Sequence, residues 1–394
     1  MIIFSYILLV IIVLILIRDN FTDITPMTVL CYPLIFSSFI AIILSSLDSN
    51  WIDISENFFP LWIVSIFFFF LGGKFSDLLV TNTFTHNTSS VNSVHFSYLR
   101  DILLIIISII FFIRAINLIS LNAYEFYVST DYFSRELVAG YYEFLRSLLI
   151  ILTIFSIASK KKNLLNIISI ITGLLIFFMF QIKGMIVMTI FSGIILGKFY
   201  KKYKFYSAKF IIPSFFLLIL VFTVSNSRFV NSLDNYQKID LKIVDSFAKS
   251  STYLVSGVFG FSSFENQNKK SLPVLLSPFN NLLREKLNLK RAVIESNPRL
   301  IYGSNITSNV STLVGTIYNY SNFTYTIIFL FVIGFFSKVL FNLRNVNIFF
   351  DAAYSINLSS LLYAFFEYYY WHQYLITIIC FLVLIGIIIK FLRL

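Results

Sequence analysis

Long apolar runs, separated by short polar segments, fill most of this chain. A run of roughly 20 apolar residues is long enough to cross the hydrocarbon core of a bilayer as a helix. The composition agrees with such spans, because 58% of the residues are hydrophobic and only 12% are charged. A soluble chain of 394 residues could not cover so much apolar surface. The sequence therefore predicts an all-α polytopic membrane protein.

About eleven runs, within a range of roughly ten to twelve, are long enough to be transmembrane helices. They divide the chain into residues 1–225 with the first eight helices, a large loop over residues 226–322, and residues 323–394 with the remaining helices. The predicted spans are Met1–Ile17, Met27–Leu47, Phe58–Gly73, Ile102–Leu121, Leu137–Ser159, Asn163–Ile182, Gly184–Phe199, Phe210–Ser225, Phe323–Phe341, Ile348–Tyr370 and Tyr374–Leu392.

Basic residues predict which loops face the cytoplasm. The chain has 30 Lys and Arg against 19 Asp and Glu, and the short segments Lys160–Lys162 and Lys198–Lys204 are strongly basic. Short loops rich in Lys and Arg are retained in the cytoplasm and also contact anionic headgroups. If every span crosses, the N-terminus and the loop 226–322 lie outside the cytoplasm, and the C-terminus lies inside. The sequence carries no nucleic-acid-binding motif, so we expect no nucleic-acid partner.

The loop 226–322 combines amphipathic segments with a polar stretch. Tyr236–Ser251 and Phe279–Ser296 carry apolar residues at helical spacing, which predicts amphipathic helices at the membrane surface. Arg299–Asn322 is instead rich in amides, hydroxyls and aromatic rings, which hold sugars by hydrogen bonds and stacking. The alternative is a solvated loop rich in turn residues. The expected glycan-binding residues are Tyr302, Asn305, Asn309, Tyr318 and Tyr320, with Gly315 allowing close backbone approach.

Ionisable side chains within the predicted spans are candidates for function, because a charge in hydrocarbon is costly unless it faces a cavity. Glu143 and Arg146 are three residues apart, a spacing that allows an ion pair on one helix face. Polar residues also recur at about every fourth position of the tenth predicted span. We expect this stripe to avoid lipid; it consists of Asp351, Ser355, Ser359, Tyr363, Glu367 and Tyr370.

Several charged residues are predicted to meet at the outer side of the spans. They are Arg114, Arg146 and Glu367 in the spans, Lys183 in the outer turn between the sixth and seventh spans, and Arg284, Lys290, Arg291 and Arg299 in the loop above them. Such a cluster suits an anionic ligand, because arginine offers paired donors to phosphate. The structural alternative is that Lys183 and Arg146 extend to lipid headgroups and that Phe365–Tyr374 forms an interfacial aromatic belt.

Three segments are similar to those of a known family. They are Phe177–Lys202 with a turn between two helices, Thr252–Phe264 early in the long loop, and the polar run Thr307–Gly334 that leads back into the membrane. Arg299 and Gly315 also match an arginine-to-glycine spacing that some members carry. On these features the chain resembles the Wzy-type O-antigen polymerases, bacterial inner-membrane enzymes that join oligosaccharide units carried on undecaprenyl pyrophosphate.

The chain departs from that family at two points. Lys183 stands where many relatives have arginine, which keeps the charge but loses the bidentate fork. No arginine near the fourth and fifth predicted spans is followed by glycine at the spacing of Arg299 and Gly315, so a second copy of the motif is missing. A scheme with two arginine-bearing loops is therefore not expected for this chain.

The resemblance implies glycosyl transfer in the periplasm, without a cofactor. A hydroxyl of one lipid-linked unit attacks the anomeric carbon of the chain on a second carrier, and the lipid pyrophosphate leaves. No Asp-x-Asp stands out in a predicted external loop, which favours a metal-independent reaction. The implied partners are the undecaprenyl-pyrophosphate-linked oligosaccharide, the lipid bilayer and a chain-length regulator protein.

The cations are expected to stabilise the departing pyrophosphate, and a carboxylate to take the proton of the attacking hydroxyl. The predicted catalytic residues are Arg299, Arg146, Arg114 and Glu143, and the base stays open among Glu143, Asp131, Glu295 and Glu367. The predicted substrate-binding residues are Lys183, Arg284, Arg291, Tyr302, Asn305, Asn309, Gly315, Tyr318, Tyr320 and Glu367.

Three other functions stay open. A flippase for the same lipid-linked units usually has short loops and two repeated halves, and this chain shows neither feature. An O-antigen ligase uses a histidine in its large loop, and residues 226–322 contain no histidine. Another lipid-linked-sugar glycosyltransferase is possible, with Asp48 or Asp53 of the first external loop as its acidic residue.

Overall fold

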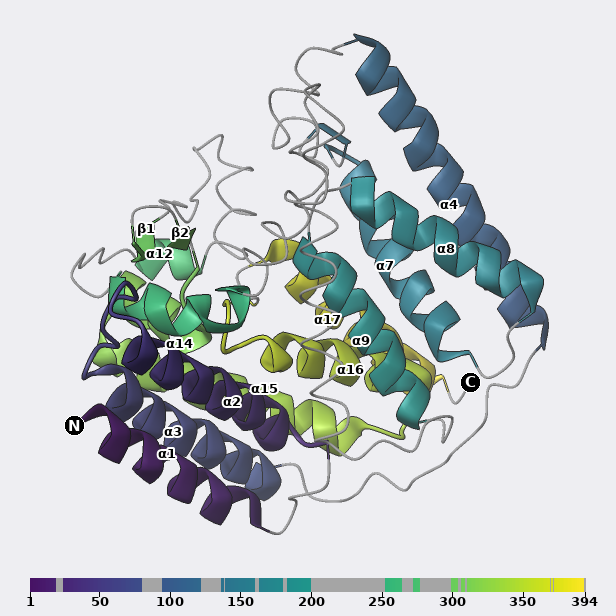
Figure 1. Cartoon of the computed structure of the whole chain (residues 1–394). Helices are drawn as coiled ribbons and strands as arrows, with labels where there is room; N and C mark the ends of the chain where they lie inside the picture. The colour runs from purple at the N-terminus through teal and green to yellow at the C-terminus, as the bar shows by residue number, and fades with distance from the viewer. Residues whose placement is uncertain are drawn as a thin grey trace.

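The chain is almost entirely helical in the part that the structure describes, with a single two-stranded hairpin (Figure 1). The computed structural model describes residues 1–18, 24–79, 94–121, 136–137, 139–159, 163–179, 183–199, 252–263, 272–276, 299–303, 306–308, 310–368, 370 and 372–392. The predicted span Phe210–Ser225 and the predicted amphipathic helices Tyr236–Ser251 and Phe279–Ser296 lie outside these residues.

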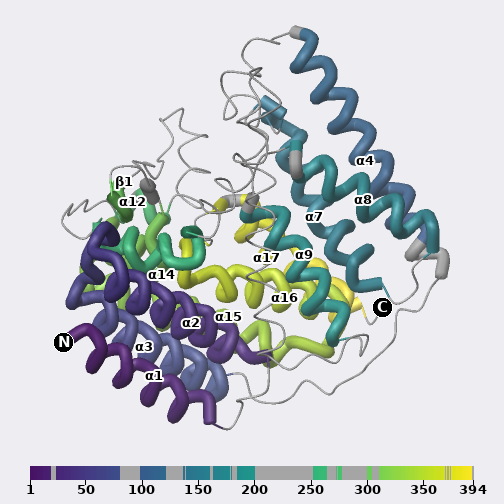
Figure 2. The backbone as a smooth tube through the Cα atoms, in the orientation of Figure 1, coloured from purple at the N-terminus to yellow at the C-terminus, as the bar shows by residue number. Residues whose placement is uncertain are grey.

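Figure 2 shows how the helices follow one another through the bundle. The helices are α1 (Ile2–Ile17), α2 (Pro26–Leu47), α3 (Phe58–Leu79), α4 (Val94–Leu121), α7 (Tyr142–Ala158), α8 (Leu164–Met179), α9 (Lys183–Phe199), α12 (Leu272–Leu275), α14 (Leu313–Tyr320), α15 (Phe323–Leu343), α16 (Ile348–Leu362) and α17 (Gln373–Phe391). The strands β1 (Arg299–Tyr302) and β2 (Ile306–Ser308) pair antiparallel. Residues 252–263 are also helical.

The protein is an all-α membrane protein. By length and composition, α2, α3, α15 and most of α4 and α17 are long and apolar enough to cross a membrane. Shorter apolar helices run through Ile2–Ile17, Leu164–Phe177, Gly184–Phe199 and Ile348–Leu362. The predicted total of about eleven spans goes beyond what these lengths establish, and it stays a prediction.

Polar residues between the apolar runs fix where several helices begin. The side chain of Asn322 accepts a hydrogen bond from the backbone N–H of Tyr325 at the start of α15. Asn347 does the same for Phe349 and Phe350 at the start of α16. These caps give hydrogen bonds to N–H groups that the first helical turn leaves unpaired. An N–H group without a partner is energetically costly near hydrocarbon.

Four predicted boundaries were wrong. Helix α4 begins at Val94 and not at Ile102, because buried hydrogen bonds of Arg100 and Asp101 allow polar residues within the helix. Helix α3 continues past Gly73 to Leu79, since its glycines pack against α15 rather than ending the helix. Helix α7 begins at Tyr142, because the backbone turns at Gly140 with φ of 68°. Helix α16 ends at Leu362, and the turn 363–366 that follows packs against residues 252–263.

The bundle has two ends with different charge. We call the hairpin end the one where the loop 48–57, the β1–β2 hairpin and the first residues of α7, α9 and α17 lie (Figure 1). Its described acidic residues are Asp48, Asp53, Glu56, Glu136, Glu143 and Glu367. The opposite end is mainly basic, with Arg18, Lys74, Arg100, Lys198, Lys338, Arg344 and Lys390.

A buried polar network at the opposite end joins α4, α7 and α8. The Oδ1 atom of Asp101 accepts hydrogen bonds from Arg100 Nη2 (2.8 Å), Ser156 Oγ (2.9 Å) and Asn166 Nδ2 (3.1 Å). Arg100 also donates through Nη1 to the carbonyl of Phe155 (3.1 Å). Because both charges are paired and hydrogen-bonded, they are tolerated away from water, and removing one partner would strand the other.

Helices α3 and α15 run parallel in direct backbone contact. A Cβ added at Gly72 would lie 2.9 Å from the backbone nitrogen of Phe335 and would overlap the carbonyl of Phe331. A Cβ added at Gly334 would lie 2.9 Å from Cα of Phe69. Small residues permit such close approach between membrane helices, where dispersion contacts replace the hydrophobic effect.

We expect Gly72→Ala to destabilise the protein and Gly73→Ala to leave it unchanged or slightly more stable. A Cβ at Gly73 would meet nothing closer than Lys338 Cβ at 3.7 Å, an ordinary contact. Overpacking costs about 1–3 kcal/mol, whereas replacing an interior helical glycine by alanine otherwise gains up to about 1 kcal/mol. Thermal unfolding of the two variants in detergent measures the difference, and equal midpoints would contradict the close α3–α15 contact.

Candidate functional site

The helix of residues 252–263 enters the bundle at the hairpin end. Its Leu254 carbonyl accepts a hydrogen bond from the buried Ser37 hydroxyl in the middle of α2 (2.5 Å). The backbone N–H of Ser55 binds the Ser262 hydroxyl (2.8 Å), so the other end of this helix lies beside the loop 48–57. Gly257 packs on the backbone of Phe365 and Phe366, which no larger residue could do without displacement. Sequence analysis placed these residues in the external loop without predicting their burial.

The loop 48–57 pairs with the hairpin. The backbone N–H of Ile52 donates to the carbonyl of Ile301 (3.2 Å), and that of Gly303 donates to the carbonyl of Asn50 (2.9 Å). The indole of Trp51 lies between the rings of Phe259 (4.7 Å) and Tyr302 (4.8 Å). The aromatic contacts and backbone bonds together tie two distant loops and the buried helix into one cover.

A hydrogen bond between Tyr302 and Asp48 closes this cover. The Tyr302 hydroxyl donates to Asp48 Oδ2 at 2.7 Å, and the backbone N–H of Asn50 donates to Asp48 Oδ1 at 2.9 Å. The Asn50 and Tyr302 bonds lower the pKa of Asp48, and the bond to Asp48 raises the pKa of Tyr302. The contact therefore persists at neutral pH and is lost only as acid protonates Asp48 or strong base ionises Tyr302.

Helix α14 forms the floor beneath the hairpin. The Thr312 hydroxyl caps it by accepting from the backbone N–H of Gly315 (3.0 Å), and the Leu313 N–H donates to the carbonyl of Ala364 (2.7 Å). Gly315 is buried against the ring of Phe261, and its expected role in approach to a glycan stays a prediction. Tyr318 is half-buried, with its ring 6.2 Å from that of Phe261.

Arg146 is the most deeply buried cation at the hairpin end, among the side chains that the structure describes. Only 6% of it is exposed. Its Nη2 lies 3.3 Å from Glu143 Oε1, which confirms the predicted ion pair, and its guanidinium lies 4.9 Å from the ring centre of Tyr374. The Nε of Arg146 has no hydrogen-bond partner among the described residues. A buried charged donor without a partner is costly, and so it is a candidate ligand-binding atom.

Two further polar side chains, His372 and Glu367, lie on the other side of the contact between Arg146 and Tyr374. The His372 ring lies 5.5 Å from that of Tyr374, and its Nε2 lies 3.6 Å from Glu367 Oε1. Glu367 and His372 are both partly exposed. The line from Glu143 through Arg146, Tyr374 and His372 to Glu367 thus places two carboxylates and one buried cation in continuous contact. This line joins the start of α7 to the segment before α17.

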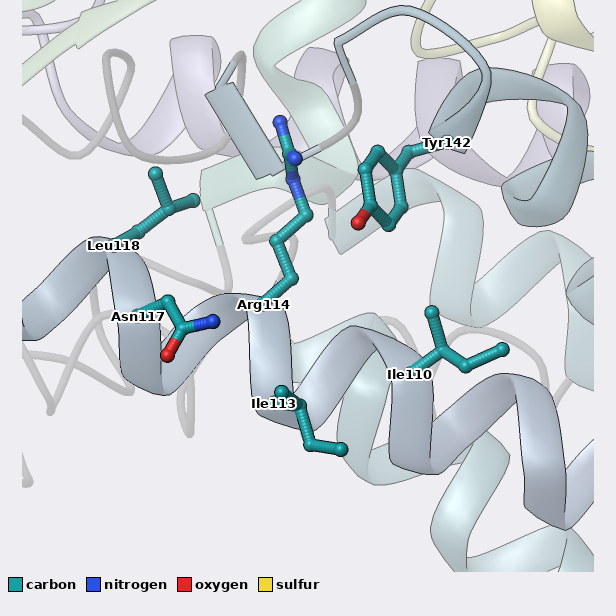
Figure 3. A pocket seen from close by; sticks show the side chains of 6 residues that line it. All are labelled: Ile110, Ile113, Arg114, Asn117, Leu118 and Tyr142. Atoms are coloured by element: carbon teal, nitrogen blue, oxygen red, sulfur yellow. The ribbon is translucent and has the colours of Figure 1, made fainter.

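Arg114 lies beside this line, in an open pocket between α4 and α7 (Figure 3). Its guanidinium lies 3.8 Å from the ring centre of Tyr142, and its Nε (3.2 Å) and Nη2 (2.5 Å) donate to the carbonyl of Glu136. The pocket has a volume of about 360 Å³ and is lined by Ile110, Ile113, Arg114, Asn117, Leu118 and Tyr142.

The structure therefore brings together Arg146, Glu143 and Glu367. Arg114 lies nearby, because it contacts Tyr142, which is one helical turn before Arg146 on α7. Two other predicted residues are placed only by their backbone. Lys183 begins α9 at the hairpin end, and Arg299 begins β1, opposite Ser308. Tyr320 ends α14 and is half-buried. The predicted residues outside the described part of the chain are Arg284, Arg291, Asn305, Asn309 and two of the candidate bases, Asp131 and Glu295.

Sequence analysis did not predict the roles of Tyr142, Tyr374 and His372. His372 and Tyr374 belong to the run Phe365–Tyr374, which was expected to form an interfacial aromatic belt. The neighbouring sequence does not distinguish a ring that contacts an arginine from one that contacts lipid headgroups. The polar stripe of α16 is buried in the bundle as expected, with Asp351, Ser355 and Ser359 each at most 5% exposed.

We expect Tyr302→Phe to loosen the cover and Tyr318→Phe to leave it intact. The first change removes the bond to Asp48, whereas the Tyr318 hydroxyl has no hydrogen bond among the described residues. Hydrogen–deuterium exchange of the peptides that contain Asn50, Ile52 and Gly303 should be several-fold faster in Tyr302→Phe than in Tyr318→Phe. Equal protection in both variants would mean that the cover does not depend on this bond.

No curated protein matched, and no solved structure matched. One family model, described as "Family of unknown function (DUF6337)", matches residues 53–393, which include the loop 48–57 from Asp53 onwards and every residue of the Arg146 line. Because this match extends over most of the chain, the protein belongs to the DUF6337 family.

Proposed function

We propose that this protein is a membrane polysaccharide polymerase that joins oligosaccharide units carried on undecaprenyl pyrophosphate. The observation that carries the proposal is the Arg146 site. It combines a buried guanidinium that has an unpaired donor with a partly exposed carboxylate, Glu367, linked to it through Tyr374 and His372. An anion-binding donor beside a base is what transfer from a pyrophosphate leaving group requires.

The charge of the two ends supports an external location for this site. Short cytoplasmic segments of membrane proteins are enriched in Lys and Arg. Among the described residues, the opposite end has seven cations against three carboxylates, whereas the hairpin end has four cations against six carboxylates. We therefore place the hairpin end in the periplasm of a bacterial inner membrane, where the lipid-linked units would be joined.

Arg146 has the properties needed to stabilise the departing pyrophosphate. Charge accumulates on this group as the sugar–phosphate bond breaks, so a fixed cation binds the transition state more tightly than the ground state. Burial strengthens the interaction, since little water screens it. The planar guanidinium can also donate two parallel hydrogen bonds to phosphate oxygens.

Among the described carboxylates, Glu367 is the better candidate for the base. Glu143 is already paired with Arg146, whereas Glu367 is partly exposed and contacts the imidazole of His372. In the proposed step, Glu367 takes the proton of the acceptor hydroxyl while the oxygen of that hydroxyl bonds to the anomeric carbon. The bond from that carbon to the phosphate oxygen breaks, and the lipid pyrophosphate leaves with the electron pair.

The sugars would lie between the cover and α14, which forms its floor. Tyr302 uses its hydroxyl for Asp48, so its contribution would be its ring and its support of the cover. Tyr318 and Tyr320 are half-buried on α14 and present the aromatic faces and hydroxyls expected for glycan contact. Arg299, at the start of β1, is proposed to contribute a further cation at this edge.

The contact of Asp48 with Tyr302 and Asn50 weighs against a different glycosyltransferase that uses Asp48. Those bonds lower the pKa of Asp48, which makes it a poorer base, and they occupy both carboxylate oxygens. No comparable contact separates the polymerase from a flippase, so that alternative is left to experiment.

We expect Arg146→Lys to abolish long polysaccharide chains. Lysine keeps the positive charge but loses the paired donors, and the loss of one transition-state donor typically reduces rates about 100-fold or more. The polysaccharide ladder on a gel measures the effect, with membrane abundance of the variant followed in parallel.

Arg344→Lys is the matched control for this variant. Arg344 also lies over an aromatic ring, that of Phe341 at 3.7 Å, but at the opposite end of the bundle. Its ladder should be normal. A normal ladder for Arg146→Lys at wild-type abundance would remove Arg146 from the catalytic site.

Deletion of the whole gene separates the polymerase from its nearest rivals. Loss of the ladder with survival of single-unit material is the expected result, because export and attachment of one unit do not require polymerisation. Loss of both products would instead indicate a flippase. Loss of all attached polysaccharide, with lipid-linked polymer accumulating, would indicate a ligase.

A further inference from the structure

We propose that the Arg114 pocket binds the phosphate group of an anionic lipid, whose hydrocarbon chain lies along α4. The binding itself does not depend on the proposed polymerase reaction. The pocket joins two kinds of surface that only an amphiphile uses together: a polar side formed by Arg114, Asn117 and Tyr142, and an apolar side formed by Ile110 and Ile113.

The apolar side continues into the surface that α4 presents to the bilayer. Ile113 is 53% exposed, and its neighbours Ile109 and Ile106 are 51% and 46% exposed. In a helix long enough to cross a membrane, such residues contact lipid. The pocket therefore opens at the edge of the lipid layer, and a lipid can enter it sideways without leaving the bilayer.

Arg114 has an uncompensated charge that faces this opening. Among the described residues, no carboxylate lies within 4.0 Å of its guanidinium, and its Nε and Nη2 donate to the neutral carbonyl of Glu136. The ring of Tyr142 covers one face of the guanidinium, and a neutral phenol does not compensate its charge. Figure 3 shows the Arg114 side chain extending between Leu118 and Tyr142, with Ile110 and Ile113 on the same helix below it. A phosphate oxygen would neutralise this charge through charge-assisted hydrogen bonds.

The pocket also lies close to the Arg146 site. Tyr142 and Arg146 are four residues apart on α7, which is about 6 Å along a helix axis. A lipid pyrophosphate bound at Arg114 would need to move by about one helical turn to reach Arg146. If the proposed function is correct, the pocket is the lateral entrance for a lipid-linked substrate. The entrance role rests on the proposed function, whereas lipid binding at Arg114 does not.

Lipid binding can be tested on the purified full-length protein by native mass spectrometry. The probes are phosphatidylglycerol, a prenyl diphosphate, zwitterionic phosphatidylethanolamine and inorganic pyrophosphate. We expect the two anionic lipids to bind and Arg114→Gln to weaken both about tenfold, the usual effect of losing one charge-assisted contact. Phosphatidylethanolamine and pyrophosphate should bind weakly, because one lacks net charge and the other lacks hydrocarbon.

Two further variants keep the test decisive. Arg344→Gln removes an arginine over a ring at the opposite end, and it should bind lipid like the wild type. Ile113→Trp fills the pocket but leaves every charge in place, so it should weaken binding even if Arg114→Gln does not fold. Unchanged binding in folded Arg114→Gln or in Ile113→Trp would overturn the site, as would an equal loss in Arg344→Gln.

The two lipids distinguish the source of the ligand. Tighter binding of the prenyl diphosphate supports the entrance role, whereas tighter or equal binding of phosphatidylglycerol supports a site for bilayer phospholipid and overturns that role. Because no acceptor or reaction is needed, these results stand apart from the polysaccharide ladder. A protein that binds lipid at Arg114 yet makes no polymer would therefore refute the proposed function alone.

Discussion

Direct contact between backbones holds the distant parts of this chain together. Gly72 and Gly334 allow α3 and α15 to touch, and Gly257 allows the buried helix 252–263 to rest on the turn after α16. Each contact joins segments that are far apart in sequence, and each depends on the absence of a Cβ. As a result, the loop 48–57, the β1–β2 hairpin and the line of residues around Arg146 are gathered at one end of the bundle.

Arg100 and Arg146, the two buried arginines among the described residues, illustrate two different uses of charge. Arg100 donates through Nε, Nη1 and Nη2 to Asp101 and to the Phe155 carbonyl, and it holds α4 to α7. Arg146 is equally buried, but it has one weak pair with a partly exposed carboxylate and an unpaired Nε. A fully bonded network stabilises a structure, whereas a cation left short of partners retains capacity for a ligand. This difference is the reason for placing the proposed site at Arg146.

Features encoded by local spacing were predictable from the sequence, and features that depend on distant contacts were not. The apolar runs predicted the membrane helices, the three-residue spacing predicted the Glu143–Arg146 pair, and the polar stripe predicted that Ser355 would avoid lipid. The hairpin had no alternating pattern, because its strands are short and are held by the loop 48–57. Burial of residues 252–263 was equally hidden, since it depends on Ser37 and on a turn more than a hundred residues later.

The aromatic partners of Arg114 and Arg146 have a chemical consequence. A carboxylate close to a guanidinium neutralises its charge and also occupies its N–H donors, as Asp101 does for Arg100. A tyrosine ring stabilises the cation through its face and leaves those donors free in the guanidinium plane. Arg114 and Arg146 both lie over tyrosine rings, those of Tyr142 and Tyr374. The rings therefore reduce the cost of burying each charge without competing for its donors. An anion that approaches in the plane would meet an arginine already oriented, which is the preorganisation that both the proposed reaction and the proposed lipid site require.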